Sequence, residues 1–381
     1  MTTATHPLPS TSADRRSTDR PDRRLERPLS LDTYRLLGSS GLRVSPLALG
    51  TMTFGTDWGW GADREEARRI FDTYVERGGN FIDSANNYTE GTSERLVGEF
   101  AAGRREQLVI ATKYTSQTRP GDPNAGGNHR KNMVRSVEES LRRLRTDYID
   151  LLYLHIWDGT TPVEEILRAM DDLVRAGKVV YVGISDTPAW QVSRMQAIAE
   201  LRGWAPLVAL QVEYSLIERT VERELIPMAS EMGLGVIPWS PLASGVLTGK
   251  YSRADLDGHE GSAEPAGTRK DVAIANGALT ERGLRIAEQV KETAARIGST
   301  RSRVAVAWTL LNPAVTAPII GARTLTQLED NLAALELDLP QEQRARLEEA
   351  SAVELGFPHD FLARPMVQNV LRGGVKIVPR A

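Results

Sequence analysis

Four residues that could move a proton stand at or shortly after apolar runs in the first half of the chain: Asp83, Tyr88, Lys113 and His155. A free tyrosine has a pKa of about 10 and is a poor acid–base group near neutrality. A neighbouring lysine ammonium favours the phenolate and brings that pKa down. An aspartate would fix the lysine through an ion pair, and a histidine would orient a substrate oxygen. The set therefore predicts proton donation to a carbonyl that receives a hydride.

Each of these residues has a structural explanation when it is considered alone. A single histidine is more often hydrogen-bonded within the fold, and a single lysine is usually ion-paired. A single aspartate commonly caps a loop, and a single tyrosine commonly packs in the core. The catalytic hypothesis therefore depends on a fold that brings the ends of several strands to one place.

The elements that would do this alternate along the chain. Short apolar runs, typical of buried parallel strands, alternate with amphipathic helical segments. Eight such repeats predict an α/β protein with a (β/α)8 TIM barrel, whose strands all end at one mouth. The predicted strands are 47–50, 80–83, 108–113, 149–155, 179–184, 207–211, 235–238 and 315–320. The predicted helices are 63–77, 93–101, 131–145, 162–176, 188–201, 221–232, 280–297 and 325–335.

Other segments lie outside this alternation. Residues 34–44 predict a short β-hairpin before the first strand. Residues 301–311 and 341–352 predict two extra helices. The segments 115–130 and 251–279 are long and polar, as active-site loops often are.

An open, doubly wound sheet is the rival fold. It would normally carry a glycine-rich phosphate-binding turn after its first strand. The segment from Gly50 to Gly55 reads Gly-Thr-Met-Thr-Phe-Gly and does not fit that fingerprint. The barrel is therefore the preferred prediction.

Composition divides the chain into three parts. Residues 1–32 contain almost no large apolar side chains, which predicts a disordered tail. Residues 33–355 form the predicted barrel domain. Residues 356–381 are a C-terminal extension with several apolar residues, and we expect it to fold over the barrel mouth.

Charge and residue counts exclude several classes of function. The chain has 47 Lys and Arg against 50 Asp and Glu, which gives no support to a nucleic-acid-binding protein. It has no cysteine and only 5 scattered histidines, so we expect no disulfide, no cysteine nucleophile and no metal site. No apolar run approaches the roughly 20 residues that span a bilayer, and no export signal is evident. We therefore expect a cytoplasmic protein without membrane partners; its oligomeric state is left open.

Short motifs accompany these residues along the chain: Leu37-Gly38 with Gly41-Leu42, Phe81 to Ala85 with Tyr88, Ala111-Thr112-Lys113, Tyr153-Leu154-His155, Gly183-Ile184-Ser185, Gln211 to Leu216 and Pro238 to Leu242. With these motifs the sequence resembles the aldo-keto reductase superfamily over about residues 34–335. The last two motifs are most similar to the bacterial sugar-ketone and aryl-alcohol reductase branch and to the β subunits of voltage-gated potassium channels.

The resemblance implies roles for the four residues and a cofactor. Tyr88 would be the general acid, Lys113 and Asp83 would tune it, and His155 would position the carbonyl of a small-molecule substrate. The cofactor would be NADPH or NADP, bound extended across the barrel mouth without a Rossmann domain. The implied cofactor-binding residues are Gly50, Thr51, Met52, Asp83, Ser185, Asp186, Gln211, Trp239, Ser240, Pro241, Leu242, Ala243, Ser244, Lys250, Gly321, Arg323, Gln327, Asp330 and Asn331.

The choice of NADPH over NADH depends on the eighth repeat. Arg323 directly precedes Thr324, the apparent N-cap of the last barrel helix. A helix N-terminus with a guanidinium beside it suits a phosphate, and the resemblance places the 2′-phosphate there. Two positions depart from the family pattern: Asp186 stands where the family often has Asn, and Asp330 stands where it often has Glu.

The substrate would lie over the nicotinamide, between loops that carry aromatic residues. Such walls suit an apolar, aromatic or sugar-like carbonyl compound. The candidate pocket residues are Phe54, Trp58, Tyr88, Tyr114, His155 and Trp157, with Trp60 as a further candidate.

Two other functions fit parts of the pattern. One is a Schiff-base aldolase on the same fold with Lys113 as nucleophile, which would not need Tyr88, Trp239 or Arg323. The other is a nicotinamide-binding, redox-sensing regulatory subunit. The intact set of four residues argues against a purely regulatory role, although the two roles can coexist.

Overall fold

Eight parallel strands form a closed barrel in the computed structural model, which describes residues 28–257, 268–375 and 377. The strands lie in the order β10-β3-β4-β5-β6-β7-β8-β9, and a parallel bridge between Val236 and Val315 closes the ring. Each predicted strand overlaps an observed one, so the predicted TIM barrel is confirmed. The strands are β3 (Ala48–Gly50), β4 (Phe81–Asp83), β5 (Val109–Tyr114), β6 (Ile149–Leu154), β7 (Val179–Ser185), β8 (Leu207–Glu213), β9 (Gly235–Trp239) and β10 (Ile319–Gly321).

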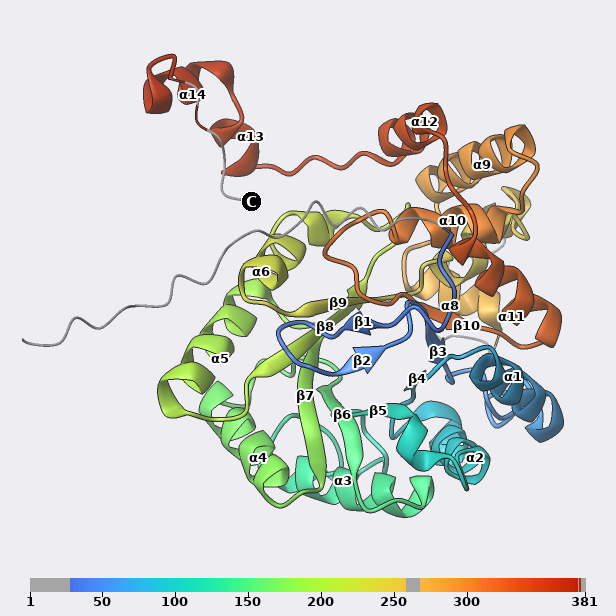
Figure 1. Cartoon of the computed structure of the whole chain (residues 1–381), viewed down its shortest axis with the longest axis vertical. Coiled ribbons are helices and arrows are strands. Elements are labelled where there is room, and N and C mark those ends of the chain that lie inside the picture. The colour runs from blue at the N-terminus through green and yellow to red at the C-terminus, as the bar shows by residue number, and fades with distance from the viewer. Residues whose placement is uncertain (1–27, 258–267, 376, 378–381) are drawn as a thin grey trace, which may run out of the picture.

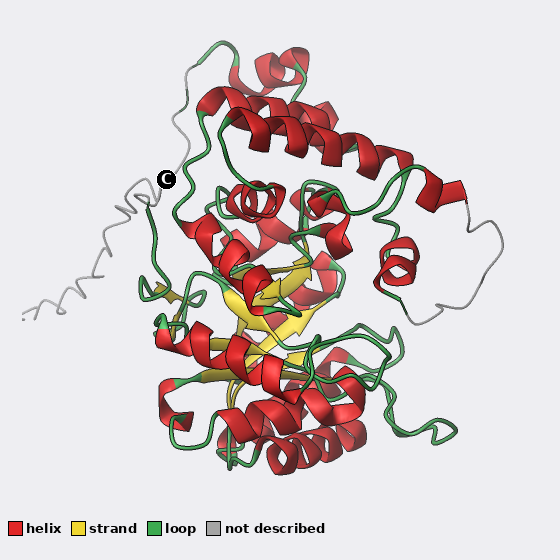
Figure 2. Cartoon of the chain, turned by 90° about the vertical axis from the view of Figure 1, so that its right-hand side faces the viewer, coloured by secondary structure: helices red, strands yellow, loops and turns green. Residues whose placement is uncertain are grey.

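Helices surround the strands on the outside, as Figure 2 shows. They present apolar stripes to the sheet; in α4, for example, Val163, Ile166, Leu167 and Met170 are buried at helical spacing. The helices that follow strands are α1 (Arg64–Glu76), α2 (Thr92–Phe100), α3 (Arg130–Leu144), α4 (Val163–Arg175), α5 (Ala189–Arg202), α6 (Leu225–Glu231), α9 (Glu281–Arg296) and α11 (Leu325–Leu332). Short 3-10 segments are η1 (Tyr88–Gly91), η2 (Arg105–Gln107), η3 (Thr220–Glu222), η4 (Ala243–Thr248) and η5 (Ala333–Leu335).

One predicted helix is divided. The segment 221–232 forms η3 and then α6, with a break at residues 223–224. Pro227 stands in the first turn of α6, where its missing N–H is harmless. An unbroken helix would place its ring against the carbonyl of residue 223, so the prediction of one continuous helix was wrong.

The predicted hairpin closes the amino-terminal end of the barrel. Strands β1 (Arg35–Leu36) and β2 (Arg43–Val44) pair antiparallel, and Leu37 and Val44 belong to the interior apolar cluster. Gly38, at φ +55°, lies so close to the barrel that a Cβ would be 2.3 Å from the carbonyl oxygen of Val208. Only glycine combines that backbone conformation with that approach.

The two predicted extra helices are present as α10 (Arg301–Thr309) and α12 (Gln341–Ser351). The predicted loop 251–279 contains two short helices, α7 (Ala254–Asp257) and α8 (Arg269–Ala275), while residues 258–267 lie outside the described part. None of the described helices has the length and apolar character that crossing a membrane requires.

The predicted domain boundaries need adjustment at both ends. Leu29 and Leu31 are 5% and 4% exposed and belong to the main core, so the predicted tail of residues 1–32 was too long. Its first 27 residues lie outside the described range. In the extension, α13 (His359–Leu362) and α14 (Pro365–Arg372) are mostly exposed and stand apart from the barrel in Figure 1. No described residue of 356–377 lines the pocket at the mouth, so the predicted cover is not seen.

Candidate active site

The carboxyl ends of the strands surround a pocket with a volume of about 1120 Å³. Asp83, Tyr88 and His155 line it, and Lys113 lies fully buried beneath them. Asp83 ends β4, Lys113 lies near the end of β5 and His155 follows β6, so three neighbouring strands bring these residues together. Tyr88 opens η1 in the loop after β4.

Lys113 connects the other polar groups of this site. Its ammonium donates to Asp83 Oδ1 at 2.5 Å, to the Ser84 carbonyl at 2.8 Å and to the Tyr88 hydroxyl oxygen at 3.1 Å. The second oxygen of Asp83 accepts a hydrogen bond from Gln211 Nε2 at 2.8 Å. The lysine therefore has an acceptor for each of its three protons, which fixes it beside the phenol.

Burial changes the proton affinities of this group. Burial raises the pKa of Tyr88 above its ordinary value, and the opposing effect of Lys113 does not cancel it. Burial alone would lower the pKa of Lys113, but Asp83 and Tyr88 outweigh it and the pKa is raised. The predicted net lowering of the tyrosine pKa was therefore wrong for this state of the site. The phenol keeps its proton and the lysine keeps its charge.

His155 stands beside the phenol as a neutral ring. Its centroid is 5.9 Å from that of Tyr88 and the two rings are inclined by 78°. Burial and the charge of Lys113 lower the pKa of His155 to about 3, so the imidazole is neutral near pH 7. Its Nδ1 is 3.4 Å from the hydroxyl of Ser116, a pocket residue that the sequence did not single out.

The ends of β7, β8 and β9 form the adjoining wall. Ser185 pairs in register with Gln211, and Trp239 ends β9 next to them. Asp186 takes a left-handed backbone conformation, at φ 39°, and its Oδ1 accepts a hydrogen bond of 3.1 Å from the Trp239 indole N–H. The Ser185 hydroxyl is buried and has no hydrogen-bond partner in the described residues. This wall therefore offers polar groups to a ligand.

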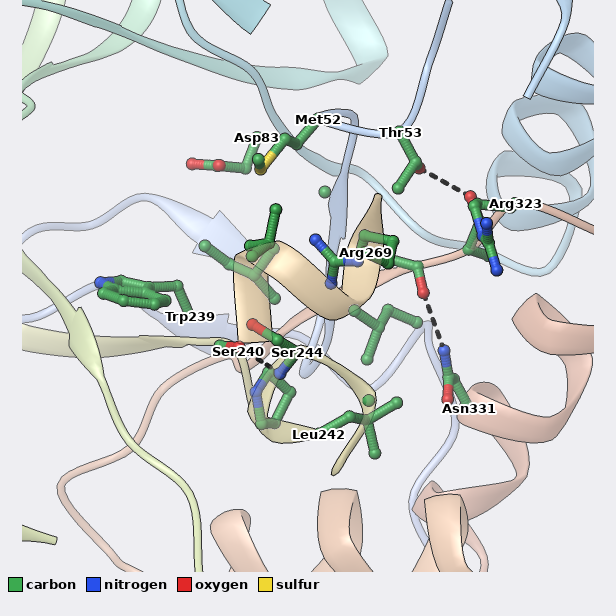
Figure 3. Close-up of a pocket in the computed structure, with 18 of the residues that line it drawn as sticks. Met52, Thr53, Asp83, Trp239, Ser240, Leu242, Ser244, Arg269, Arg323 and Asn331 are labelled. Carbon is green, nitrogen blue, oxygen red and sulfur yellow. Dashed lines mark hydrogen bonds between the residues drawn. The ribbon is translucent and has the colours of Figure 1, made fainter. Parts of the chain in front are cut away.

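Four cations line the pocket away from that wall: Lys250, Arg269, Arg303 and Arg323. In Figure 3, Trp239 lies at one side of the pocket, Arg323 with Asn331 at the other, and Arg269 between them. Burial and the charges of Arg269 and Arg323 lower the pKa of Lys250 to about 8. Positive charges gathered in this way favour the binding of an anion.

The N-terminus of α11 contributes less to this anion site than the sequence predicts. Thr324 is its N-cap and accepts from the N–H of Gln327, as expected. The N–H of Leu325, however, already donates to Glu66 Oε1 at 2.6 Å. The attraction for a phosphate at this end therefore rests on the cationic side chains rather than on free helix N–H groups.

Most residues predicted to bind the cofactor line this one pocket, but two do not. Thr51 is fully buried, and its hydroxyl donates to the Asp83 carbonyl at 3.0 Å. Ala243 is also fully buried. The predicted cofactor residues that do line the pocket are Gly50, Met52, Asp83, Ser185, Asp186, Gln211, Trp239, Ser240, Pro241, Leu242, Ser244, Lys250, Gly321, Arg323, Gln327, Asp330 and Asn331.

Three of the six residues predicted to form the substrate pocket do not line it. Trp58 lines the pocket with Tyr88 and His155, whereas Phe54, Tyr114 and Trp157 do not. Successive strand residues face opposite sides, so Tyr114 points away from the barrel when Lys113 points in; the Tyr114 hydroxyl donates to the Asn128 carbonyl.

Phe54 and Trp157 serve the core instead. Phe54 packs at 6.3 Å from the ring of Phe100, and Trp157 packs partly buried against the main core. The structure adds Asn87, Ser116 and Ile156 to the wall. Only their nearness in sequence to Lys113, His155 and Tyr88 could have indicated them.

Arg269 was also missed: it is the first residue of α8, within the segment 251–279 that the sequence analysis treats as a loop. Its guanidinium lies over the ring of Trp60, 5.2 Å from the centroid, and Trp60 contacts Trp58 at 5.6 Å between centroids. At the far end, Asp330 is paired with Arg303 at 2.8 Å. The departure at Asp330 is thus accommodated by an ion pair within the protein.

Comparison with known proteins agrees with this geometry. The chain is 39% identical to a norsolorinic acid reductase of Aspergillus flavus over 90% of this chain and 87% of the relative. It is 41% identical to YrpG of Bacillus subtilis, an uncharacterised oxidoreductase, over 81% of this chain and 93% of the relative. It is 35% identical to an NADP(+) aryl-alcohol dehydrogenase of Phanerodontia chrysosporium over 88% of this chain and 90% of the relative. Residues 46–352 match the family described as the aldo/keto reductase family, and the chain therefore belongs to it.

Proposed function

We propose that this protein is an NADPH-dependent reductase that transfers a hydride to the carbonyl of an aldehyde, ketone or keto-sugar. The observation that carries the proposal is the buried contact of 3.1 Å between the Tyr88 hydroxyl and the Lys113 ammonium, which Asp83 holds in place at the pocket floor. A protonated phenol beside a fixed cation can release its proton to a developing alkoxide.

The pocket suits the cofactor at both ends. One end has the buried Ser185 hydroxyl and the Gln211 amide, which can bond a carboxamide, and Trp239, whose ring can stack on an aromatic group. The other end has Arg269 and Arg323, which suit phosphates. When it is bound, the dinucleotide supplies the hydride.

The side chains supply the rest of the reaction. Tyr88 gives its proton to the carbonyl oxygen, and Lys113 stabilises the resulting phenolate across the 3.1 Å contact. Asp83 keeps the lysine charged and in position. Neutral His155 offers a ring nitrogen to the same oxygen and aligns the carbonyl for attack.

An aromatic carbonyl compound is the substrate class that we favour. Trp58 and the half-exposed Ile156 flank Tyr88 and His155 in the pocket and present apolar surface. Two relatives are named for norsolorinic acid and for aryl alcohols. We also propose that the protein prefers NADPH to NADH and that it is cytoplasmic.

The two alternatives explain less of the site. A Schiff-base aldolase needs a neutral, accessible lysine, whereas Lys113 is fully buried and its pKa is raised. A redox-sensing regulatory subunit would need the nucleotide-binding residues but not the buried contact between Tyr88 and Lys113. It is the second candidate, because the cations that line the pocket would bind a nucleotide equally well for it.

Loss of absorbance at the nicotinamide band separates these functions. Purified protein with NADPH and a panel of aromatic and aliphatic aldehydes is expected to oxidise the cofactor fastest with the aromatic ones. Binding of NADPH without turnover of any carbonyl compound would favour the regulatory role. Retro-aldol cleavage without a nucleotide would favour the aldolase.

A further inference from the structure

The carboxylates that line the pocket differ in whether a cation balances their charge, and Asp186 has no such cation paired with it in the described residues. Asp83 is neutralised by Lys113 and Asp330 by Arg303. Asp186 makes no ion pair within the described residues: its side chain accepts from the neutral indole of Trp239, and the neutral Ser185 hydroxyl lies close enough to lower its pKa. It lines the pocket at the end where Tyr88 and His155 also lie. A ligand at this end therefore meets an uncompensated carboxylate.

Asp186 lies beside the reacting groups. It directly follows β7, the strand that pairs with β6, and His155 directly follows β6. The Asp186 carbonyl accepts from the Trp157 N–H at 3.3 Å, and the Asp186 side chain lines the pocket with Tyr88 and His155. Its charge also acts to raise the pKa of Tyr88. A nicotinamide ring that gave its hydride to a carbonyl held by Tyr88 and His155 would therefore lie at the same end of the pocket as Asp186.

The two redox states of the cofactor differ in one charge at that ring. The oxidised ring is a cation and the reduced ring is neutral, whereas their phosphates are identical. A nearby carboxylate attracts the cation and has almost no effect on the neutral ring. An uncharged asparagine at this position would lack this discrimination.

We propose that Asp186 is a specificity-determining residue that makes the pocket favour NADP⁺ over NADPH, relative to an asparagine at the same position. This inference rests on the proposed function. Its consequence is that the bound couple gives up its hydride more readily than it would in an Asn-containing pocket, and that NADP⁺ is retained longer after the carbonyl has been reduced. The Trp239 N–H holds the carboxylate at the ring end of the pocket, through the hydrogen bond of 3.1 Å.

The discrimination depends on the ionisation of Asp186. Burial raises its pKa to about 6. Charged and titratable groups on the neighbouring elements interact with it. Lys113 of β5 favours the carboxylate, and the charge of Asp186 raises the pKa values of Tyr88 of η1 and Glu213 of β8. His155, after β6, stays neutral because its pKa is about 3. Asp186 is therefore ionised at pH 7.5 and largely protonated at pH 5.

The test is calorimetric measurement of the dissociation constants of NADP⁺ and NADPH for wild type and Asp186→Asn. At pH 7.5 the ratio Kd(NADP⁺)/Kd(NADPH) is expected to rise about five- to thirty-fold in the variant, the range for a unit charge several ångströms away in a partly solvated site. In wild type the ratio is expected to rise as the pH falls from 7.5 to 5, and in the variant it should stay constant. Because both nucleotides carry the same phosphates, phosphate titration cancels in the ratio.

Asp330→Asn is the matched control, since it removes the same charge from the other end of the same pocket. It is expected to change both dissociation constants by the same factor. An unchanged ratio in Asp186→Asn, or an equal rise of the ratio in Asp330→Asn, would overturn the inference while the reductase function stands. Wild-type protein that binds neither nucleotide would overturn the proposed function and this inference with it.

Discussion

A phenol that must give up a proton is held in this protein where its proton is hard to remove. Burial raises the pKa of Tyr88, and Lys113 offsets only part of that rise. Without substrate, Tyr88 is therefore a protonated phenol that can serve as a general acid. The Lys113 ammonium stabilises the site most after proton transfer, when it lies beside a phenolate. That order of charges suits reduction of a carbonyl, in which negative charge develops on oxygen.

Tyr88→Phe tests the proton donor. The change removes one hydroxyl and keeps the ring, so we expect kcat to fall about 10²-fold or more, the usual contribution of a general acid. The dissociation constant of NADPH should hardly change, which titration of the nucleotide will show. Tyr153→Phe is the control, because the Tyr153 hydroxyl is buried in the same barrel without a hydrogen-bond partner in the described residues. Near-normal turnover by Tyr88→Phe would remove this residue from the mechanism.

Lys113 and Asp83 should behave as one unit. Lys113→Met removes the cation and is expected to abolish measurable turnover while circular dichroism shows an intact fold. Asp83→Asn should be damaging because it frees the lysine, whose ammonium is 2.5 Å from Asp83 Oδ1. The double variant should therefore be little worse than Lys113→Met alone in steady-state kcat/KM. Losses that multiply fully would show that the two residues act independently.

The identities of the four central residues could be predicted from the sequence, but their energetics could not. Asp83, Lys113 and His155 each end an apolar run, and a parallel barrel necessarily gathers such ends. The net direction of the tyrosine pKa depends on how deeply the phenol is buried, and no local pattern encodes that. Ser116 and Arg269 were missed for a similar reason, since each is an ordinary polar residue in a segment that was predicted to be a loop, although Arg269 in fact begins α8.

At the scale of elements, the strands were easier to predict than the loops between them. A buried parallel strand has a continuous apolar run, and each of the predicted strands overlaps an observed one. The aromatic residues of the loops were less predictable, because an aromatic ring can cover either the pocket or the core. Trp58 lines the pocket and Phe54 packs in the core, although they are only four positions apart.

The α11 end of the pocket yields a prediction about the nucleotide. Since Glu66 already occupies the N–H of Leu325, the guanidinium groups must provide most of the attraction for a 2′-phosphate. Arg323→Ala should weaken NADPH binding by ~1.5–3 kcal/mol, the range for hydrogen bonds to charged groups, and leave NADH binding almost unchanged. Fluorescence titrations that follow the quenching of Trp239 and other tryptophans will measure both.

Arg346→Ala provides the control for that experiment. Arg346 pairs with Glu342 within α12 at 3.0 Å and neither residue lines the pocket, so the variant removes a guanidinium without changing the charge of the pocket. It should leave both nucleotides unaffected. Equal weakening of NADPH and NADH by Arg323→Ala, or a wild-type preference for NADH, would contradict the assignment of the 2′-phosphate.

At the scale of the whole molecule, the chain ends were the least predictable part. Leu29 and Leu31 lie in a segment that is polar on average, yet they are buried, and the N–H of Leu29 donates to the Leu335 carbonyl. A composition average cannot show that two leucines dock against a helix far away in sequence. The apolar residues of α14 led to the opposite error. They suggested that this helix covers the barrel mouth, but in the described structure they are mostly exposed and do not line the pocket.

The stability of the whole fold should carry a pH signature from Glu213, at the end of β8. Burial, with help from the charges of Glu218 and Asp186, raises the pKa of Glu213 to about 7. In the unfolded chain a glutamate has a pKa near 4.3. Below that value the side chain is neutral in both states and has no electrostatic cost. As the pH rises through 7 the folded state must hold a poorly solvated carboxylate, so stability present in acid is lost toward pH 8.

Glu213→Gln should therefore stabilise the protein at pH 8 by about 1–2 kcal/mol, after allowance for the partial exposure of the group, and should have little effect near pH 4.5. Chemical denaturation of both proteins across this pH range measures the difference directly. Glu231→Gln, at an exposed position on α6, is the control, and its effect should stay within about 0.5 kcal/mol at every pH. A constant difference between wild type and Glu213→Gln from pH 4.5 to pH 8 would show that the carboxylate is well solvated in the folded state.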